Sequence, residues 1–232
     1  MAVSRYFSNS QLAERVNIAN GRTLGVSHIN KFGFTGTDTG ASTIWDANGT
    51  TAYYPYPAAG TVTAVSASNA GASVEVQGLD ANYSPQTVIV TIGGSASTET
   101  FSRVFRARMV DINNDADVNI NVGGSLAARI STDNGQTLMS VYTVPAGCKG
   151  YLMKFVGTTD KANVDVKFKI FARPFGGTFN LKGEFGTQGG NPIMYEYMIP
   201  LEFDEKTDIK IDVDNSATTG CGATFDLLLV DN

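Results

Sequence analysis

Histidine and cysteine are scarce in this sequence. Its 232 residues include one histidine, His28, and two cysteines, Cys148 and Cys221. Ser-His-Asp or Cys-His catalysis would have to use His28, and no G-x-S-x-G turn accompanies it. No C-x-x-C spacing offers a structural zinc site, and no P-loop or dinucleotide-binding glycine motif is present. We therefore predict no enzyme activity, no catalytic residue, no metal site and no cofactor.

Long apolar runs and basic clusters are missing as well. No stretch reaches the roughly 18 apolar residues that a membrane-spanning helix needs, and residues 1–6 do not resemble a secretion signal. The net charge is −5, and the 17 lysines and arginines are dispersed. A nucleic-acid-binding face needs them concentrated. We expect a soluble protein that binds neither nucleic acid nor membranes, with thiols kept free in a reducing cytoplasm unless the two cysteines come close enough to pair.

Short runs of alternating apolar residues dominate the rest of the chain. Residues 137–143 and 151–156 are rich in β-branched and aromatic side chains and flank a turn that contains Pro145 and Gly147. These two runs are expected to form a hairpin, and residues 164–173, which alternate with period 2, to add a third strand. A sheet of this kind needs a second apolar layer to cover it.

Similar runs recur along the sequence and set the fold class. They occupy residues 61–66, 73–77, 87–92, 101–110, 118–122, 126–130, 178–185, 194–201, 208–214 and 223–230. About a dozen strands with almost no helix indicate an all-β protein, an antiparallel β-sandwich of jelly-roll type.

The N-terminal quarter has a weaker pattern. We expect residues 1–60 to form an irregular arm with at most one short helix, which starts at the capping box of residues 8–11 and stops at Asn20-Gly21. Residues 61–232 would form the sandwich body, with a subdomain boundary near residues 93–100. Aromatic side chains in the arm either hold a neighbouring subunit or cover the chain's own core; they are Trp45, Tyr53, Tyr54 and Tyr56.

Two short motifs resemble functional sites. Asp38-Thr39-Gly40 is the tripeptide of aspartic proteases, but the residues before it do not form an apolar strand, so a plain turn is favoured. Residues 111–117 carry oxygen-bearing side chains at alternate positions, as calcium loops do. The sixth position is Ala116 rather than glycine and the twelfth is Val122 rather than an acid, which excludes an EF-hand. An irregular calcium site and a solvated loop both remain open.

A series of short phrases in this order resembles a family of virion structural proteins of tailed bacteriophages, of the marine and cyanophage type. The phrases are His28–Gly33, Thr43–Asp46, Tyr54–Pro57, Val76–Asp80, Phe105–Ala107, Gly135–Met139, Tyr142–Gly147, Arg173–Gly177, Pro200–Leu201, Lys206–Ile209 and Asp226–Asn232. They span most of the chain, and the family offers no catalytic motif to carry over.

The resemblance implies a non-enzymatic virion component made in the host cytoplasm, most simply a capsid decoration or cement protein. Its partners would be other virion proteins, the major capsid protein among them, and copies of itself. One alternative is a tail, baseplate or fibre-associated protein that contacts the host surface. A carbohydrate-binding module or glycan-degrading enzyme is another alternative, supported only by the sugar-binding habit of jelly rolls.

Overall fold

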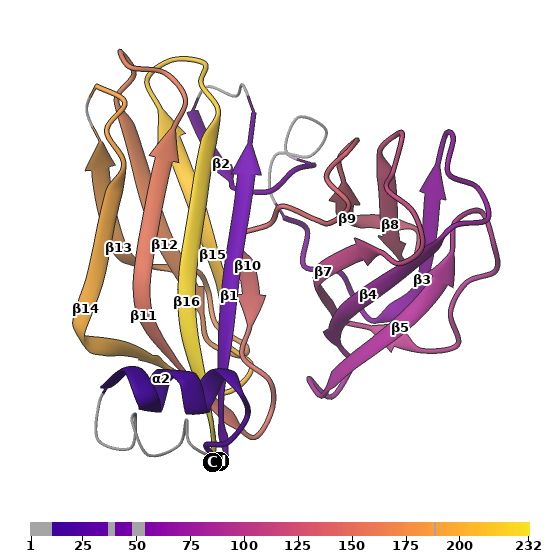
Figure 1. Cartoon of the computed structure of the whole chain (residues 1–232), viewed down its shortest axis with the longest axis horizontal. Helices are drawn as coiled ribbons and strands as arrows, with labels where there is room; N and C mark the ends of the chain where they lie inside the picture. The colour runs from indigo at the N-terminus through magenta and orange to yellow at the C-terminus, as the bar shows by residue number, and fades with distance from the viewer. Residues whose placement is uncertain (1–10, 37–39, 48–53, 188) are drawn as a thin grey trace.

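Two β units lie side by side in the chain (Figure 1). The computed structural model describes residues 11–36, 40–47, 54–187 and 189–232. The larger unit is a sandwich whose strands are β1 (Val26–Thr35), β2 (Gly40–Thr43), β10 (Val141–Thr143), β11 (Cys148–Thr159), β12 (Val166–Arg173), β13 (Asn180–Thr187), β14 (Ile193–Phe203), β15 (Asp208–Asn215) and β16 (Cys221–Asp231). Sheet 1 has the order β1-β16-β11-β14, and sheet 2 has the order β10-β15-β12-β13 with β2 also on β15.

The strand pairing of the sandwich is that of a jelly roll. β2 and β10 pair with successive parts of β15, so they are two halves of one strand. With these halves counted together, the first strand pairs with the eighth, the second with the seventh, the third with the sixth and the fourth with the fifth. All of these pairs are antiparallel. This nested order defines a jelly roll, and the expectation of an all-β antiparallel sandwich is confirmed.

Apolar residues that alternate along the strands fill the space between the two sheets. Ile209, Ile211 and Val213 of β15 are fully buried, as their period-2 spacing predicts. Phe155 of β11 and Phe168 of β12 meet across the layers with ring centroids 5.7 Å apart. Large side chains from both sheets therefore form one continuous core.

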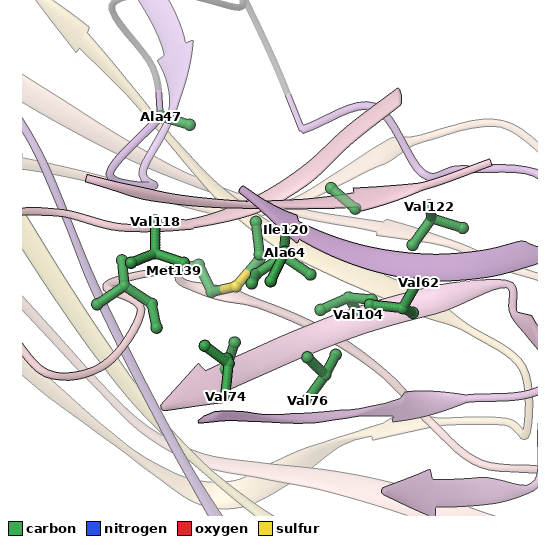
Figure 2. Close-up of a cluster of buried hydrophobic side chains, with 14 of the residues drawn as sticks. Ala47, Val62, Ala64, Val74, Val76, Val104, Val118, Ile120, Val122 and Met139 are labelled. Carbon is green, nitrogen blue, oxygen red and sulfur yellow. The ribbon is translucent and has the colours of Figure 1, made fainter. Parts of the chain in front are cut away.

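The second unit, which we call the insert, comprises residues 45–139 and interrupts the second strand of the jelly roll. Its strands are β3 (Gly60–Ser66), β4 (Ser73–Leu79), β5 (Pro85–Thr91), β6 (Thr100–Phe101), β7 (Arg103–Met109), β8 (Val118–Val122) and β9 (Ser125–Ile130). They form sheets of order β6-β3-β8-β9 and β5-β4-β7. Figure 2 shows the valine-rich core between them, which includes Val62, Val76, Val104 and Ile120. The insert thus has a core of its own.

The two ends of the insert leave the sandwich at one point. The N–H of Ile211 donates to the carbonyl of Ser140 at 3.1 Å, and its carbonyl accepts from the N–H of Ile44 at 2.9 Å. One residue of β15 therefore joins both halves of the split strand. Trp45 and Met139 then form an antiparallel bridge as the chain enters and leaves the insert. Ends this close allow a whole folded unit to be accommodated within a strand.

Gly33 of β1 is required at this junction. A Cβ atom on Gly33 would lie 2.5 Å from the Ser140 nitrogen and 2.8 Å from the Ile44 oxygen. Both are backbone atoms, held by the pairing just described, so they cannot move aside. Only glycine lets β1 of sheet 1 approach the split strand of sheet 2 so closely.

The expected division of the chain at residue 60 is wrong. Residues 26–35 are not part of an irregular arm but form β1, which pairs along its whole length with β16. The inward side chains of this strand include Lys31, Gly33 and Thr35, so the apolar alternation that marks a strand is absent from the sequence. Residues 93–100 connect β5 to β6 inside the insert, and the units separate at residues 45 and 139 instead.

The expected hairpin between residues 137–143 and 151–156 is also wrong. β10 pairs with β15 in sheet 2, whereas β11 pairs with β14 and β16 in sheet 1. The turn at residues 144–147 therefore carries the chain from one layer of the sandwich to the other. Residues 166–173 return to sheet 2 as β12. Local alternation predicts each strand but does not distinguish a hairpin turn from a crossing between layers.

One helix, α2 (Gln11–Ala19), lies across the outer face of sheet 1 (Figure 1). It ends as predicted at Gly21, which has a φ of 65°. The N–H of Gly21 bonds to the carbonyl of Ile18, and the N–H of Arg22 to that of Asn17, which is a Schellman motif. The first part of the predicted capping box, residues 8–10, lies outside the described residues. Within the described ranges, no helix has the length and hydropathy to cross a bilayer.

Candidate interaction surfaces

The aromatic residues expected to hold a neighbour lie mainly in the interior of this chain. Trp45 is fully buried and Tyr54 almost so. Their rings meet edge to face with centroids 5.5 Å apart, and the Tyr54 ring meets Tyr56 at 4.8 Å. Of the two roles considered, covering the chain's own core describes Trp45 and Tyr54. Tyr53 lies outside the described residues.

Tyr56 lies where the insert contacts the sandwich. Its ring is 5.3 Å from the Arg103 guanidinium of the insert and 4.7 Å from the Arg173 guanidinium of β12. Burial is the main reason that the pKa of Tyr56 is well above its ordinary value. An aromatic ring held between two guanidinium groups ties the two units together through cation–π contacts.

Asp208 is the charged centre of this junction. Its carboxylate accepts bonds from Arg103 Nε at 2.7 Å, from Arg173 Nε at 2.9 Å and from Thr143 Oγ1 at 2.6 Å. Only 3% of the residue is exposed. Two guanidinium groups and a hydroxyl thus satisfy one buried carboxylate. The arginines that interrupt the apolar strand at residues 101–110 were visible in the sequence pattern, but their partner Asp208 was not.

Two further ionisable groups, Lys31 and Asp46, lie where the insert joins the sandwich. Lys31 Nζ donates to the carbonyl of Phe105, and burial, aided by nearby Arg106, holds its pKa well below the usual value. Burial likewise raises the pKa of Asp46 to about 7. One oxygen of Asp46 accepts from the N–H of Leu138 at 3.2 Å, and the other has no hydrogen-bond partner. Lys31 is buried and Asp46 is partly buried, and neither lines the cleft described below.

Apolar side chains are exposed on the two strands at the opposite edge of the sandwich, which we call the β13–β14 edge. β13 and β14 are the last strands of sheets 2 and 1, and most of their length lies on the side of the sandwich away from the insert (Figure 1). The start of β13 is close to the insert, because the Phe179 ring lies 5.3 Å from that of Tyr56. Five large apolar side chains are exposed there: Leu181, Met194, Tyr195, Met198 and Ile199. By the strand register, Met194 lies opposite Val156 on the outer face of sheet 1, and Leu181 lies opposite Phe171 on the outer face of sheet 2. Exposed apolar residues on edge strands are candidates for contact with a partner.

A cleft of about 410 Å³ lies between α2 and the outer face of sheet 1. His28 is at its side, where Nε2 lies 3.1 Å from Asp226 Oδ1. The same oxygen accepts from Asn30 Nδ2 at 2.7 Å. Within the described part of the chain, no serine or cysteine lines this cleft beside His28.

The structure describes the two motifs that resembled catalytic or metal sites to different extents. Asp38 and Thr39 lie outside the described residues, and Gly40 begins β2. In the 111–117 loop, the Asn114 side chain is buried and donates to the carbonyls of Ala116 and Ser131. In the part of the chain that the structure describes, no three His, Cys, Asp or Glu side chains gather closely enough to hold a metal ion.

Both cysteines are free thiols. Cys148 lies opposite Asp231, and Cys221 lies opposite Thr159, so the two are at opposite ends of β11. At about 3.3 Å per residue, these ends are on the order of 35 Å apart, far beyond disulfide reach. Burial is the main cause that raises the pKa of Cys221 to about 11, which keeps this thiol protonated and unreactive.

Comparisons with known proteins give weak similarity to viral particle proteins. No protein family model matches the chain, and no curated protein matches it. A structure of the T13 particle of infectious bursal disease virus aligns at 12% identity and a TM-score of 0.28, over 88% of this chain and 69% of that one. The VP2 subviral particle of the same virus aligns at 11% identity and a TM-score of 0.26, over 88% and 72%. At these values the similarity decides neither the fold nor the function of this chain.

Proposed function

We propose that the chain is a non-enzymatic structural component of a tailed-phage virion, attached to the head as a decoration or cement protein. Its partners are the major capsid protein and further copies of itself. The sequence resemblance, which extends from His28 to Asn232, supports the class of particle. The jelly roll is compatible with this role, since viral coat domains use it, but fold alone does not decide function.

The β13–β14 edge carries the proposal. Met194 is 67% exposed on β14, the last strand of sheet 1, and Leu181 is 51% exposed on β13, the last strand of sheet 2. A chain that worked alone would gain solubility from polar residues at these positions. Apolar side chains are retained where a partner covers them, and many copies on a symmetric particle multiply weak contacts into firm attachment.

The junction between the units supports a mechanical role. Arg103 of the insert pairs with Asp208 of the sandwich, which also holds Arg173, so a buried ion pair joins the two units. Lys31, Asp46 and Tyr56, whose pKa values are shifted mainly by burial, lie at this junction and do not line the cleft beside α2. Two units joined in this way, with an apolar edge on the sandwich, are suited to bridging neighbouring proteins on a shell.

Localisation on the particle tests the proposal. The full chain, carrying a small C-terminal label, is incorporated into particles, and labelled density is located by electron cryomicroscopy. We expect density on the head at symmetric positions. Density confined to the tail would assign the tail or baseplate role instead, and absence from purified particles would reject a virion role altogether.

Measuring the attachment of variants to particles tests the role of the β13–β14 edge. Leu181→Ser combined with Met194→Ser should lower occupancy on particles, because it removes apolar contact area from the β13–β14 edge. The matched control is Val65→Ser with Ile89→Ser, which changes two similarly exposed apolar residues of the insert. Deletion of residues 2–10, which lie outside the described residues, tests the arm separately. A longer deletion would remove β1 and β2 and with them part of the sandwich.

A further inference from the structure

Two adjacent aliphatic side chains project from a kink in β14. Leu152 of β11 pairs with Leu201, and Lys154 pairs with Glu196, so Met153 alone lies opposite residues 197–200. The extra residues push outward, and Met198 is 101% exposed and Ile199 84% exposed. We call this pair the plug. Nothing in the described chain covers it, and the pairing of β14 with β11 resumes at Leu201, directly after Pro200.

The cleft beside α2 offers an apolar socket on the same sheet. Ile18 and Ala19 of the helix form one wall, and Met153 and Leu228 of β11 and β16 lie below them. Its volume of about 410 Å³ falls within the range of sites that hold small apolar ligands. Two aliphatic side chains therefore fit its chemistry and its size.

The charges at the rim of the socket favour an uncharged occupant. Arg15 lies 3.7 Å from Glu196, and His28 lies 3.1 Å from Asp226. Lys154 is placed between Asp226 and Glu196 by the strand register. The rim thus holds Arg15 and Lys154 beside Glu196 and Asp226, and a charged ligand would have to break these contacts. Residues 197–200, Tyr-Met-Ile-Pro, carry no charge, so they can enter the socket without breaking the charge pairs at its rim.

Plug and socket are neighbours in one chain. Glu196 lines the cleft, and Met198 follows two residues later on the same strand, yet it stays outside its own cleft. A two-fold axis beside β14 would exchange them between two copies, each plug meeting the other copy's socket. Such an isologous interface limits the assembly to two subunits, and each dimer contains the plug–socket contact twice. The inserts, attached at the far edge of the sandwich, would point away from this axis (Figure 1).

We propose that two copies of the chain associate in this way, with Met198 and Ile199 of each copy seated in the cleft between α2 and sheet 1 of the other. The inference rests on the self-association included in the proposed function and names the surfaces that perform it. Residues 181 and 194, assigned above to particle attachment, are not part of the plug.

Sedimentation equilibrium of the full chain tests the inference. We expect a dimer whose dissociation constant rises at least about tenfold in Met198→Ser with Ile199→Ser, as for loss of an interface anchor. Ala19→Trp, which fills the socket, should weaken the dimer similarly. Val65→Ser with Ile89→Ser, in the insert, should leave it unchanged. Circular dichroism and Tm should match the unmodified chain, because the plug side chains contribute no packing within it.

Mixing the two defective variants gives the decisive result. A plug-deficient copy still has a socket, and a socket-filled copy still has a plug, so their mixture regains one of the two contacts. We expect heterodimers that are tighter than either variant's own dimer. A monomeric unmodified chain, or a dimer insensitive to both variants, would overturn the inference. Particle attachment is measured separately. A monomeric chain that still attached to particles would remove self-association from the proposed function and leave the attachment to the head standing.

Discussion

Arg103 and Asp208 are separated by 105 residues in the sequence, and their Nε and Oδ1 atoms lie 2.7 Å apart. The arginine belongs to the insert and the carboxylate to the sandwich. A second bond, from Arg103 Nη2 to Asp208 Oδ2 at 3.2 Å, makes the contact two-pronged. Because a planar guanidinium fits a carboxylate in few orientations, this pair fixes the angle between the units as well as their distance.

Replacing Asp208 should be among the costliest single changes in the chain. Asp208→Asn leaves the guanidinium groups of Arg103 and Arg173 without their anion at a buried site. We expect the free energy of unfolding to fall by about 3 to 5 kcal/mol, the usual cost of breaking a buried charge pair. Urea unfolding followed by fluorescence measures this change.

Glu75 provides the matched control for that experiment. It accepts bonds from Nε and Nη2 of Arg108, both at 2.9 Å, so its geometry is also two-pronged and its arginine is also on β7. The Arg108 side chain is exposed, and Glu75→Gln should cost no more than about 1 kcal/mol. Equal losses at both sites would show that burial does not set the strength of the Asp208 pair.

Gly33→Ala tests the close approach of β1 to the split strand. The added methyl group would lie within 2.8 Å of two backbone atoms, so β1 must shift and its pairing with β16 must loosen. We expect a loss of about 1 to 3 kcal/mol in the free energy of unfolding, the range for overpacking a core. Gly186→Ala in β13 is the control, because no atom lies within 4 Å of the added carbon. If both substitutions were neutral, the junction would not be as tight as described.

Asp46 should make the stability of the chain depend on pH near neutrality. Burial raises its pKa to about 7, whereas in the unfolded chain an aspartate titrates near 3.9. Between these values the folded chain holds a proton that the unfolded chain has lost. The stability linked to this group is therefore complete below pH 4, is lost as pH rises to about 7, and changes little above that.

Comparison of Tm from pH 4 to 8 in the native chain and in Asp46→Asn measures this effect. The variant keeps an oxygen for the Leu138 N–H but cannot ionise, so the native chain should lose about 2 to 4 kcal/mol more over this range. Lys31 and Arg129 are the cations that act on Asp46, and both remain in the variant. Asp115→Asn, at an exposed loop position, should follow the native profile. Parallel profiles for the native chain and Asp46→Asn would contradict the prediction.

Removal of the insert should leave a folded jelly roll. The Ser140 nitrogen lies 2.9 Å from the Ile44 oxygen, so a link of two glycines can replace residues 45–139 without moving either half of the strand. We expect far-UV circular dichroism typical of β structure and a cooperative thermal transition at a lower Tm, because Asp208 keeps Arg173 but loses Arg103. A product without a cooperative transition would mean that the sandwich depends on the insert for folding.

The sequence allowed prediction of those parts of the fold in which side chains alternate clearly. Ile209, Ile211 and Val213 predicted a strand with one buried face, and Asn20-Gly21 predicted the end of the helix. β1 was missed because its inner face carries Lys31 and Gly33, whose roles depend on Phe105 and Ser140, distant in sequence. The ion-pair cluster at Asp208 was not predicted for the same reason, since its partners are distant in sequence. An aspartate in an alternating strand resembles a solvated residue until its partners are known.

The split second strand has a consequence for the order in which the chain folds during synthesis. In the described part of the chain, β1 pairs only with β16 and β2 only with β15. The earliest strands of the sandwich therefore have no partner until the last strands have been synthesised. The insert is complete by residue 139, before any sandwich pair can form. The insert can therefore fold first, while β2 and β10 on either side of it are still unpaired. Its folding brings β2 and β10 close together, which shortens the effective loop that must close when β15 pairs with them.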